Sequence, residues 1–385
     1  MNDQPWHPSR VPPSQWMDTE LTPEEERRFD SLVAIELDEA LERRLTHPAL
    51  SYPSEAAVLA VHWHPEFVPL AWVTRRLEAM FPNATERLII PTQHNHILTL
   101  DGYCGLELDC HSREFGLKVQ LLIHFAEHRM PRAQTLEAMA EYTFRYRASQ
   151  LYDFLHALSS PDKAGLRGDA ARESAALDND EMEFVRIQSW KLSRLVEARG
   201  PGADPMMLRN KLVMDWFASL TDRWDPAFIQ RVLPFLRAVK LKVKQAFSPE
   251  YFFLTQEVIE EARSIGAGII VPHPEQFWPI LLADYDIDGY EVWNPQSQAY
   301  TNFLMGAVQN INRTGRRRTR PLLTLMGDDC HLSEKCKPSH AQDPEKAARE
   351  VGLQPAWDDL GIKKTLAMYN IRKTEIISEY RQRLT

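Results

Sequence analysis

The stretch Ala60-Val61-His62-Trp63-His64 closes an apolar run with two histidines one residue apart. Alternate side chains of a β-strand point to the same side, so both imidazoles would face one direction. A lone histidine at a strand end is usually a structural residue, because metal ligation needs several donors at once. For two histidines at this spacing, a metal-binding role and a structural role are about equally favoured. The other motifs of the chain are needed to choose between the two roles.

Six later segments repeat this form, in which an apolar or β-prone run carries a side chain that can bind a metal. They are residues 88–94, 105–107, 119–124, 268–273, 289–294 and 322–331. Asp329 and His331 repeat the spacing of His62 and His64. Strand ends that all present such side chains predict a barrel with a metal site at one rim.

Eight side chains are the predicted metal ligands. They are His62, His64, His94, Glu107, His124, His273, Asp329 and His331. Eight donors exceed what one ion needs, so we predict two or three divalent ions that share Glu107 or a hydroxide as a bridge. Imidazole and carboxylate ligands accept Zn, Mn or Fe, and multi-metal clusters of this kind suit phosphoester hydrolysis.

The composition limits the class of protein. The chain has 385 residues, 44% of them hydrophobic, and a formal net charge of -9, which together indicate a globular protein without a dominant polyanion-binding surface. The basic run at residues 316–320 is therefore interpreted as a solvated connection, and nucleic acid is not the favoured partner. No run is long and apolar enough to predict a membrane span. Four cysteines and a start without an apolar signal core favour a reducing cytoplasm. The oligomeric state leaves no pattern in the sequence.

The periodicity divides the chain into five parts. We predict an N-terminal arm and helix (1–56), the first part of a barrel (57–130), a helical insertion (131–249), the second part of the barrel (250–335) and a helical C-terminal extension (336–385). The expected strands are 57–64, 87–94, 106–110, 117–125, 267–273, 290–294 and 321–327. The expected helices are 23–45, 69–80, 134–158, 181–198, 205–220, 226–247, 251–264 and 299–313. The polar stretch 159–180 predicts a mobile connection.

Two of these parts shape the predicted architecture. The segments 106–110 and 117–125 are separated by a turn-like sequence and predict an antiparallel hairpin, which argues against a regular (β/α)8 barrel. The helix at 23–45 should pack outside the barrel. The insertion at 131–249 should either cover the rim as a lid or serve a partner.

In this order, the motifs resemble those of the PHP (polymerase and histidinol phosphatase) superfamily. The matching elements are His62-Trp63-His64, Thr92-Gln93-His94, Gly105-Leu106-Glu107, His124, His273-Pro274, Tyr290-Glu291-Val292-Trp293-Asn294 and Gly327-Asp328-Asp329-Cys330-His331. The resemblance covers 57–125 and 250–333, about 150 residues. It implies a distorted (β/α)7 barrel of the PHP type that hydrolyses phosphoesters with up to three ions.

The same resemblance implies the role of each ligand. His62, His64, Glu107, His273 and the Asp329/His331 pair would bind metal with Glu107 as the bridge, while His94 and His124 would complete further sites. The sequence departs from the family at three points. Val61 stands where an acidic residue is usual, Gln93 replaces the aspartate of the second motif, and Glu66 is the one candidate for a further ligand after the first motif.

These observations predict a metal-dependent phosphoesterase that acts on a small-molecule phosphoester. A metal-bound hydroxide would attack phosphorus, and Glu107, Asp329 and His331 would be the catalytic residues, with Asp329 or a nearby histidine handling the proton. One alternative is an amidohydrolase-like metal hydrolase, although that family's bridging lysine is not apparent. Another is a non-catalytic PHP-like scaffold that presents its helical insertion to a partner.

Overall fold

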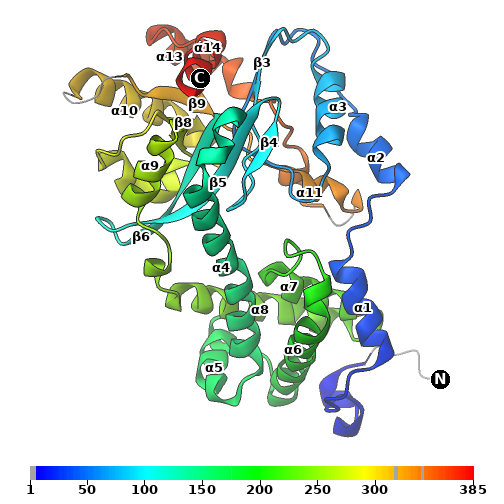
Figure 1. Ribbon diagram of the computed structural model, residues 1–385. Coiled ribbons are helices and arrows are strands. Elements are labelled where there is room, and N and C mark those ends of the chain that lie inside the picture. The colour runs from blue at the N-terminus through cyan, green and yellow to red at the C-terminus, as the bar shows by residue number, and fades with distance from the viewer. Residues whose placement is uncertain (1–5, 175, 316–319, 340–341) are drawn as a thin grey trace. The chain divides into compact units, whose positions relative to one another are not determined.

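The computed structural model describes residues 6–174, 176–315, 320–339 and 342–385 (Figure 1). It consists of two compact units. One, here called the helical unit, combines Met1–Glu36 with Arg145–Ser248, and the other, the strand unit, combines Leu37–Phe144 with Pro249–Thr385. The boundary between Phe144 and Arg145 falls inside helix α4 (Gln134–Ser159). Each unit encloses buried apolar clusters of its own.

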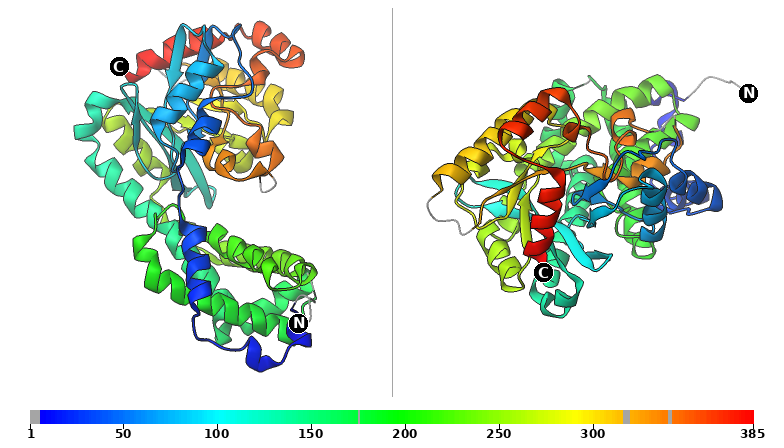
Figure 2. Two further views of the ribbon diagram at one scale, coloured as in Figure 1. Left: turned by 90° about the vertical axis from the view of Figure 1, so that its right-hand side faces the viewer. Right: turned by 90° about the horizontal axis from the view of Figure 1, so that it is seen from above.

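The helical unit joins the N-terminal segment to the predicted insertion, as the dark-blue and green helices of Figure 2 show. Its helices are α1 (Pro23–Val33), the second part of α4, α5 (Ala164–Glu173), α6 (Asn179–Arg199), α7 (Asn210–Ser219) and α8 (Pro226–Ala246). Within the predicted arm, Trp16 is buried and its ring meets Phe184 edge-on at 6.4 Å between centroids. The described part of the arm therefore belongs to the core of this unit.

The single helix predicted over residues 23–45 is wrong. Thr22 and Glu25 form the expected capping box, but α1 ends at Val33 and a second helix, α2 (Glu39–Thr46), begins after a break. Asp38 starts α2, because its carboxylate accepts the backbone N–H of Leu41 at 2.7 Å. The two helices belong to different units.

The stretch 159–180, predicted to be a mobile connection, contains helix α5. This helix packs on α8 and buries Ala170. Arg167 donates from Nη1 to the carbonyl oxygens of Ala157 (3.0 Å) and Ser160 (2.6 Å), which ties the start of α5 to the end of α4. The polar composition of residues 159–180 does not reveal this helix, because the carbonyl oxygens that hold Arg167 lie at the end of α4 and just after it.

The strand unit contains ten strands among the described residues. They are β1 (Ala57–Ala60), β2 (Trp63–His64), β3 (Glu86–Ile89), β4 (Leu98–Leu100), β5 (Tyr103–Ser112), β6 (Leu117–Ala126), β7 (Gly268–Val271), β8 (Gly289–Trp293), β9 (Leu323–Met326) and β10 (Cys330–His331). A six-stranded sheet runs in the order β4-β5-β6-β7-β8-β9, and two further parallel pairs are β1 with β3 and β2 with β10. The unit is thus mixed α/β.

The predicted hairpin is confirmed as β5 and β6, which pair antiparallel over their full length. Along β5, Leu106 and Leu108 pack into the main apolar cluster, whereas Glu107 and Asp109 alternate with them and face the opposite side. Both faces are buried. This alternation places the carboxylate of Glu107 on the face where the predicted ligands meet.

The strands do not form one closed ladder among the described residues, so a (β/α)7 barrel is not shown. The predicted strand 57–64 is divided into β1 and β2, and the predicted strand 87–94 ends at Ile89. Pro91 has no N–H to continue the ladder, and beyond it an isolated bridge pairs His94 with Glu107. At the other edge of the six-stranded sheet, the side chain of Gln354 joins β9 to β1.

Helices pack around the strands and around one another in this unit. They are α2, α3 (Leu70–Met80), the first part of α4, α9 (Thr255–Ser264), α10 (Thr301–Thr314), α11 (Leu332–Cys336), α12 (Pro344–Ala347), α13 (Leu360–Met368) and α14 (Lys373–Leu384). Helix α9 lies against β5 and β7, α10 against β8 and β9, and α14 against β1, β3, β6, β7 and β9. None of the described helices combines the length and apolar character that a bilayer crossing needs. Residues 316–319 of the basic run lie outside the described residues.

A glutamine from the C-terminal extension joins β1 to β9. The buried Nε2 of Gln354 donates to the carbonyl oxygens of Leu59 and Met326, both at 2.7 Å, and its Oε1 accepts the indole N–H of Trp357 at 2.7 Å. One side-chain amide thus takes the place of a backbone ladder.

We expect Gln354→Leu to lower the free energy of unfolding by about 2 kcal/mol, because two buried carbonyls and an indole N–H would lose their partner. Urea unfolding followed by circular dichroism measures this. Gln382→Leu, on α14, is the control, since that side chain is not buried. Equal midpoints for wild type and Gln354→Leu would show that the amide does not join the strands.

Candidate metal centre

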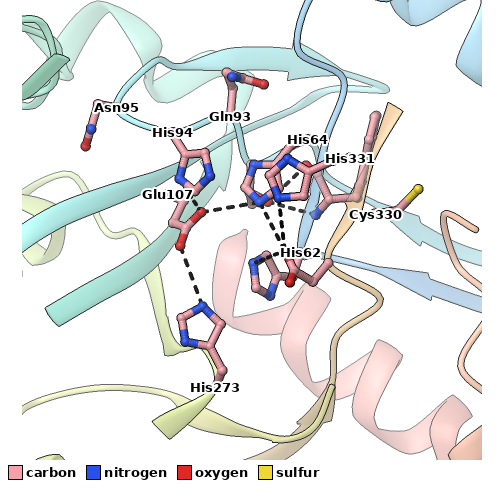
Figure 3. Close-up of polar contacts among 12 residues, drawn as sticks. His62, His64, Gln93, His94, Asn95, Glu107, His273, Cys330 and His331 are labelled. Atoms are coloured by element: carbon pink, nitrogen blue, oxygen red, sulfur yellow. Dashed lines mark hydrogen bonds and ion pairs between the residues drawn. The ribbon is translucent and has the colours of Figure 1, made fainter. Parts of the chain in front are cut away.

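Seven of the eight predicted ligands gather in the strand unit (Figure 3). They form three overlapping groups whose donor atoms lie within 4.8 Å of one another. The groups are His64/His94/His331, His62/Glu107/His273 and His62/His64/Asp329. Because His62 and His64 each belong to two groups, the three groups are one cluster.

Asp329 forms one centre of this cluster. Its Oδ1 lies 3.6 Å from Nε2 of His62, 3.6 Å from Nε2 of His64 and 3.4 Å from Nε2 of His331. Two donors that each lie about 2.1 Å from a cation at a tetrahedral angle are about 3.4 Å apart. The imidazoles around Oδ1 therefore have the spacing of ligands that share an ion.

Glu107 forms the other centre, and its two oxygens meet different imidazoles. Oε2 lies 2.7 Å from Nδ1 of His94 and 3.3 Å from Nε2 of His64, while Oε1 lies 3.9 Å from Nε2 of His273. A carboxylate with a different set of imidazoles at each oxygen has the arrangement of a bridging ligand.

The donor atoms of the cluster fit a bound cation. His62, His64 and Glu107 are at most 1% exposed, yet Nε2 of His62, both nitrogens of His64 and both oxygens of Glu107 have no aligned hydrogen bond with the described residues. Leaving buried polar atoms unpaired costs about 1–3 kcal/mol each, so such atoms imply a ligand. Imidazole and carboxylate donors are those that Zn, Mn and Fe bind in proteins.

A carboxylate behind the cluster orients His62. Nδ1 of His62 lies 2.7 Å from Oε2 of Glu291, a residue of β8 that is 229 positions away. Oε1 of Glu291 in turn accepts a hydrogen bond from Nδ2 of Asn294 at 2.8 Å. With the Nδ1 proton donated to Glu291, Nε2, the atom that faces Asp329, is the nitrogen that would release its proton and offer a lone pair to a cation.

A second carboxylate lies behind His331. Oε1 of Glu66 is 3.6 Å from Nδ1 of His331, and Oε2 of Glu66 accepts the backbone N–H of Ser333 at 3.0 Å. Gln93 accepts the backbone N–H of Glu66 through Oε1 at 2.9 Å. Gln93 therefore supports the loop that carries Glu66.

The cluster's charges move the pKa values of its imidazoles in opposite directions. Burial lowers the pKa of His62, but Glu291, Asp329 and Glu107 outweigh burial and raise it to about 10. Burial also lowers the pKa of His331, but Asp329 and Glu66 outweigh burial and raise this pKa to about 9. For His64, burial and the neighbouring His94 and His331 lower the pKa to about 3. The cluster thus attracts positive charge, which a divalent cation would supply while releasing protons.

Two members of the cluster have strained backbones. His273 (φ 29°) and Asp329 (φ 44°) adopt positive φ values, as do Glu66 (φ 55°) and Asn95 (φ 52°), which flank cluster residues. Non-glycine residues pay about 1–3 kcal/mol for such conformations, and they concentrate at functional sites. Asn95 is held by Asp109, which it meets through two hydrogen bonds of 2.9 and 3.0 Å. This pairing fixes the loop that presents His94.

His124 is the predicted ligand that joins none of the three groups. It lies opposite Gly105 in the hairpin, on the face that carries Glu107, but its Nδ1 is 2.6 Å from the hydroxyl of Tyr380 on α14. Burial and the nearby His62 lower the pKa of His124 to about 3. The ring is therefore neutral; α14 occupies its Nδ1, and its Nε2 is buried without an aligned hydrogen bond among the described residues.

We expect Tyr380→Phe to lower the free energy of unfolding by about 1 kcal/mol, because His124 loses its hydroxyl partner. Metal content should stay at the wild-type value if His124 packs against α14 rather than binding an ion. Chemical denaturation and elemental analysis measure the two quantities. Loss of an ion in Tyr380→Phe would return His124 to the ligand set.

Sequence reasoning missed three residues that contact the cluster. Glu291 could have been found, since it is a charged residue within the apolar run of β8 and was part of a matched motif. Gln296 and Arg349, which bind Asp329, follow no local pattern. Their partner is assigned only by the folded chain.

No protein-family model and no curated protein matches this chain. Among solved structures, the chain is similar to a protein of Bifidobacterium adolescentis whose assignment as a metal-dependent phosphoesterase is provisional. The two chains share 14% sequence identity with a TM-score of 0.41, over 83% of this chain and 97% of the other. A likeness this distant assigns no function, so the chemistry must be argued from the side chains.

Proposed function

We propose that this protein is a metal-dependent hydrolase, most directly a phosphoesterase of the PHP type with a distorted barrel. The observation that carries the proposal is the convergence of five imidazoles on two carboxylates, those of Glu107 and Asp329, although these seven residues span positions 62 to 331. Packing alone gives no reason to bury His62, His64 and Glu107 side by side with donor atoms left unpaired.

The donor set suits two ions. It offers five imidazole nitrogens, both oxygens of Glu107 and Oδ1 of Asp329, because Oδ2 of Asp329 is taken by Arg349 and Gln296. His124 and a third ion are not needed to satisfy these atoms. When bound, divalent ions polarise a phosphoryl oxygen and lower the pKa of water.

The chain's own residues define the remaining roles. Glu107 holds the two halves of the cluster together, and Glu291 fixes the tautomer of His62. His331 has a side chain that is 28% exposed, more than His94 at 19%, so it is the imidazole best placed to meet a substrate and its leaving group. Burial raises the pKa of Asp329, but His331, His64 and His62 outweigh burial and hold that pKa well below the usual range. Asp329 is therefore poorly suited to accept and release a proton.

Phosphate release from small phosphoesters tests the proposal. Metal-free protein is supplied with Mn²⁺ or Zn²⁺, and p-nitrophenyl phosphate and bis(p-nitrophenyl) phosphate are offered beside a phosphate-free lactone and a phosphate-free anilide. Hydrolysis of the phosphoesters supports the proposal. Cleavage of the lactone or anilide alone would favour the amidohydrolase alternative, and fewer than one tightly bound ion per chain would favour the non-catalytic scaffold.

A further inference from the structure

Arg349 lies beside the cluster although it belongs to the C-terminal extension. Its side chain is 7% exposed, and Nη1 donates both to Oδ2 of Asp329 (2.9 Å) and to the carbonyl oxygen of Asp329 (3.1 Å). Nε2 of Gln296 donates to the same Oδ2. Oδ2 therefore has two donors, while Oδ1 faces the three imidazoles.

These bonds fix the rotation of the Asp329 carboxylate. A carboxylate free to rotate can offer either oxygen or both to a cation, whereas one whose Oδ2 is held by a guanidinium offers a single oxygen. The backbone is fixed as well, because Asp329 adopts a positive φ of 44° while its N–H donates to the carbonyl of His62 at 2.9 Å and its own carbonyl is held by Arg349.

Arg349 is itself held in place by the segment around it. Glu350 receives Nε and Nη2 of Arg76 at 2.9 and 2.6 Å and Nζ of Lys335 at 2.9 Å. Gly352 donates its N–H to Oδ2 of Asp328 at 2.9 Å. The segment that carries Arg349 is therefore tied to α3, to α11 and to the loop before β10.

Resting on the proposed function, we infer that Arg349 is a positioning residue that makes Asp329 a one-oxygen metal ligand. Its guanidinium acts through Asp329, without itself contacting the ion. The C-terminal extension is then part of the metal centre, and the affinity for the ion bound by His62, His64 and Asp329 depends on it.

Metal titration of the full-length, metal-stripped protein tests this inference without any hydrolysis. Mn²⁺ binding is followed by calorimetry and by counting bound spins in wild type, Arg349→Met, Arg349→Lys and Arg383→Met. The last is a matched control, because Arg383 is also a buried arginine paired with a buried carboxylate, and its partner Asp288 belongs neither to the cluster nor to the segment that carries Arg349. Circular dichroism confirms that each variant is folded, and Gln296→Leu replaces Arg349→Met if that variant does not fold.

We expect Arg349→Met to weaken binding of one Mn²⁺ by about 10–100-fold and to leave the other unchanged, which is the usual effect of removing a group that orients a ligand. Arg349→Lys should lie between, since it keeps the charge without the fork geometry. Arg383→Met should melt earlier and bind Mn²⁺ as wild type does. Wild-type binding in Arg349→Met, or equal weakening in Arg383→Met, would overturn the inference. So would full metal content with a raised KM for a phosphoester, which would make Arg349 a substrate contact. If wild type binds Mn²⁺ but hydrolyses none of the phosphoesters, the proposed function fails. The Mn²⁺ affinities of the variants still decide this inference.

Discussion

Replacing Glu107 by glutamine is expected to reduce phosphoester hydrolysis at least about a thousandfold and to remove tightly bound metal. Glutamine keeps the size of the side chain but loses the charge that both halves of the cluster share at Oε1 and Oε2. Metal-dependent stabilisation of charge in the transition state contributes several kcal/mol, and each 1.36 kcal/mol is a factor of about ten in rate. Initial rates and elemental analysis of the purified variant measure the two effects.

Glu114→Gln is the matched control for this experiment. Glu114 lies at the exposed turn of the same hairpin, so its replacement removes one negative charge from β5–β6 without touching the cluster. Its rate and metal content should equal those of wild type. If Glu107→Gln also kept both, Glu107 would not be a bridging ligand and the proposed two-ion site would have to be abandoned.

Gly327→Ala is expected to lower the free energy of unfolding by about 3 kcal/mol and to weaken metal binding. A Cβ at this position would lie 2.2 Å from Oε1 and 2.4 Å from Cδ of Glu291. That carboxylate is buried and holds His62 and Asn294, so it cannot move away without breaking both contacts. The glycine is therefore required by the close approach of the group that orients His62.

Gly306→Ala separates this collision from a general effect of adding a methyl group. Gly306 lies inside α10, where an added Cβ would meet nothing nearer than the hydroxyl of Tyr369 at 3.7 Å. Alanine is favoured over glycine in a helix, so this variant should be slightly more stable than wild type. Urea unfolding and Mn²⁺ titration measure the free energy of unfolding and the Mn²⁺ affinity of both variants. If Gly327→Ala were as stable as Gly306→Ala, Glu291 would be able to move away from the added Cβ.

The sequence located most of the cluster because its signals are local. His62 with His64, and Asp329 with His331, are neighbours in the chain whose spacing matches the period of a strand. The hairpin of β5 and β6 likewise follows from alternation and a turn. The single helix predicted over residues 23–45 is wrong because Asp38 caps a second helix, although the apolar pattern continues past that residue.

The partners of these residues could not be predicted in the same way. His124 has the right spacing for the cluster, but Tyr380, 256 positions away, occupies one of its nitrogens. Arg349 holds Asp329, and Gln354 joins β1 to β9, yet neither stands in a periodic pattern. Polar contacts of this kind are single pairings and leave no repeat to recognise.

Alone, then, the sequence determined which side chains share a strand face and where charged residues interrupt apolar runs, since both follow from the fixed geometry of neighbouring residues. Only the tertiary structure decided which of those side chains meet, which oxygen of Asp329 faces the imidazoles and which carboxylate orients His62. The reason is physical: a ligand set is defined by distances of a few ångströms between atoms that chain folding brings together, and local periodicity carries no information about those distances.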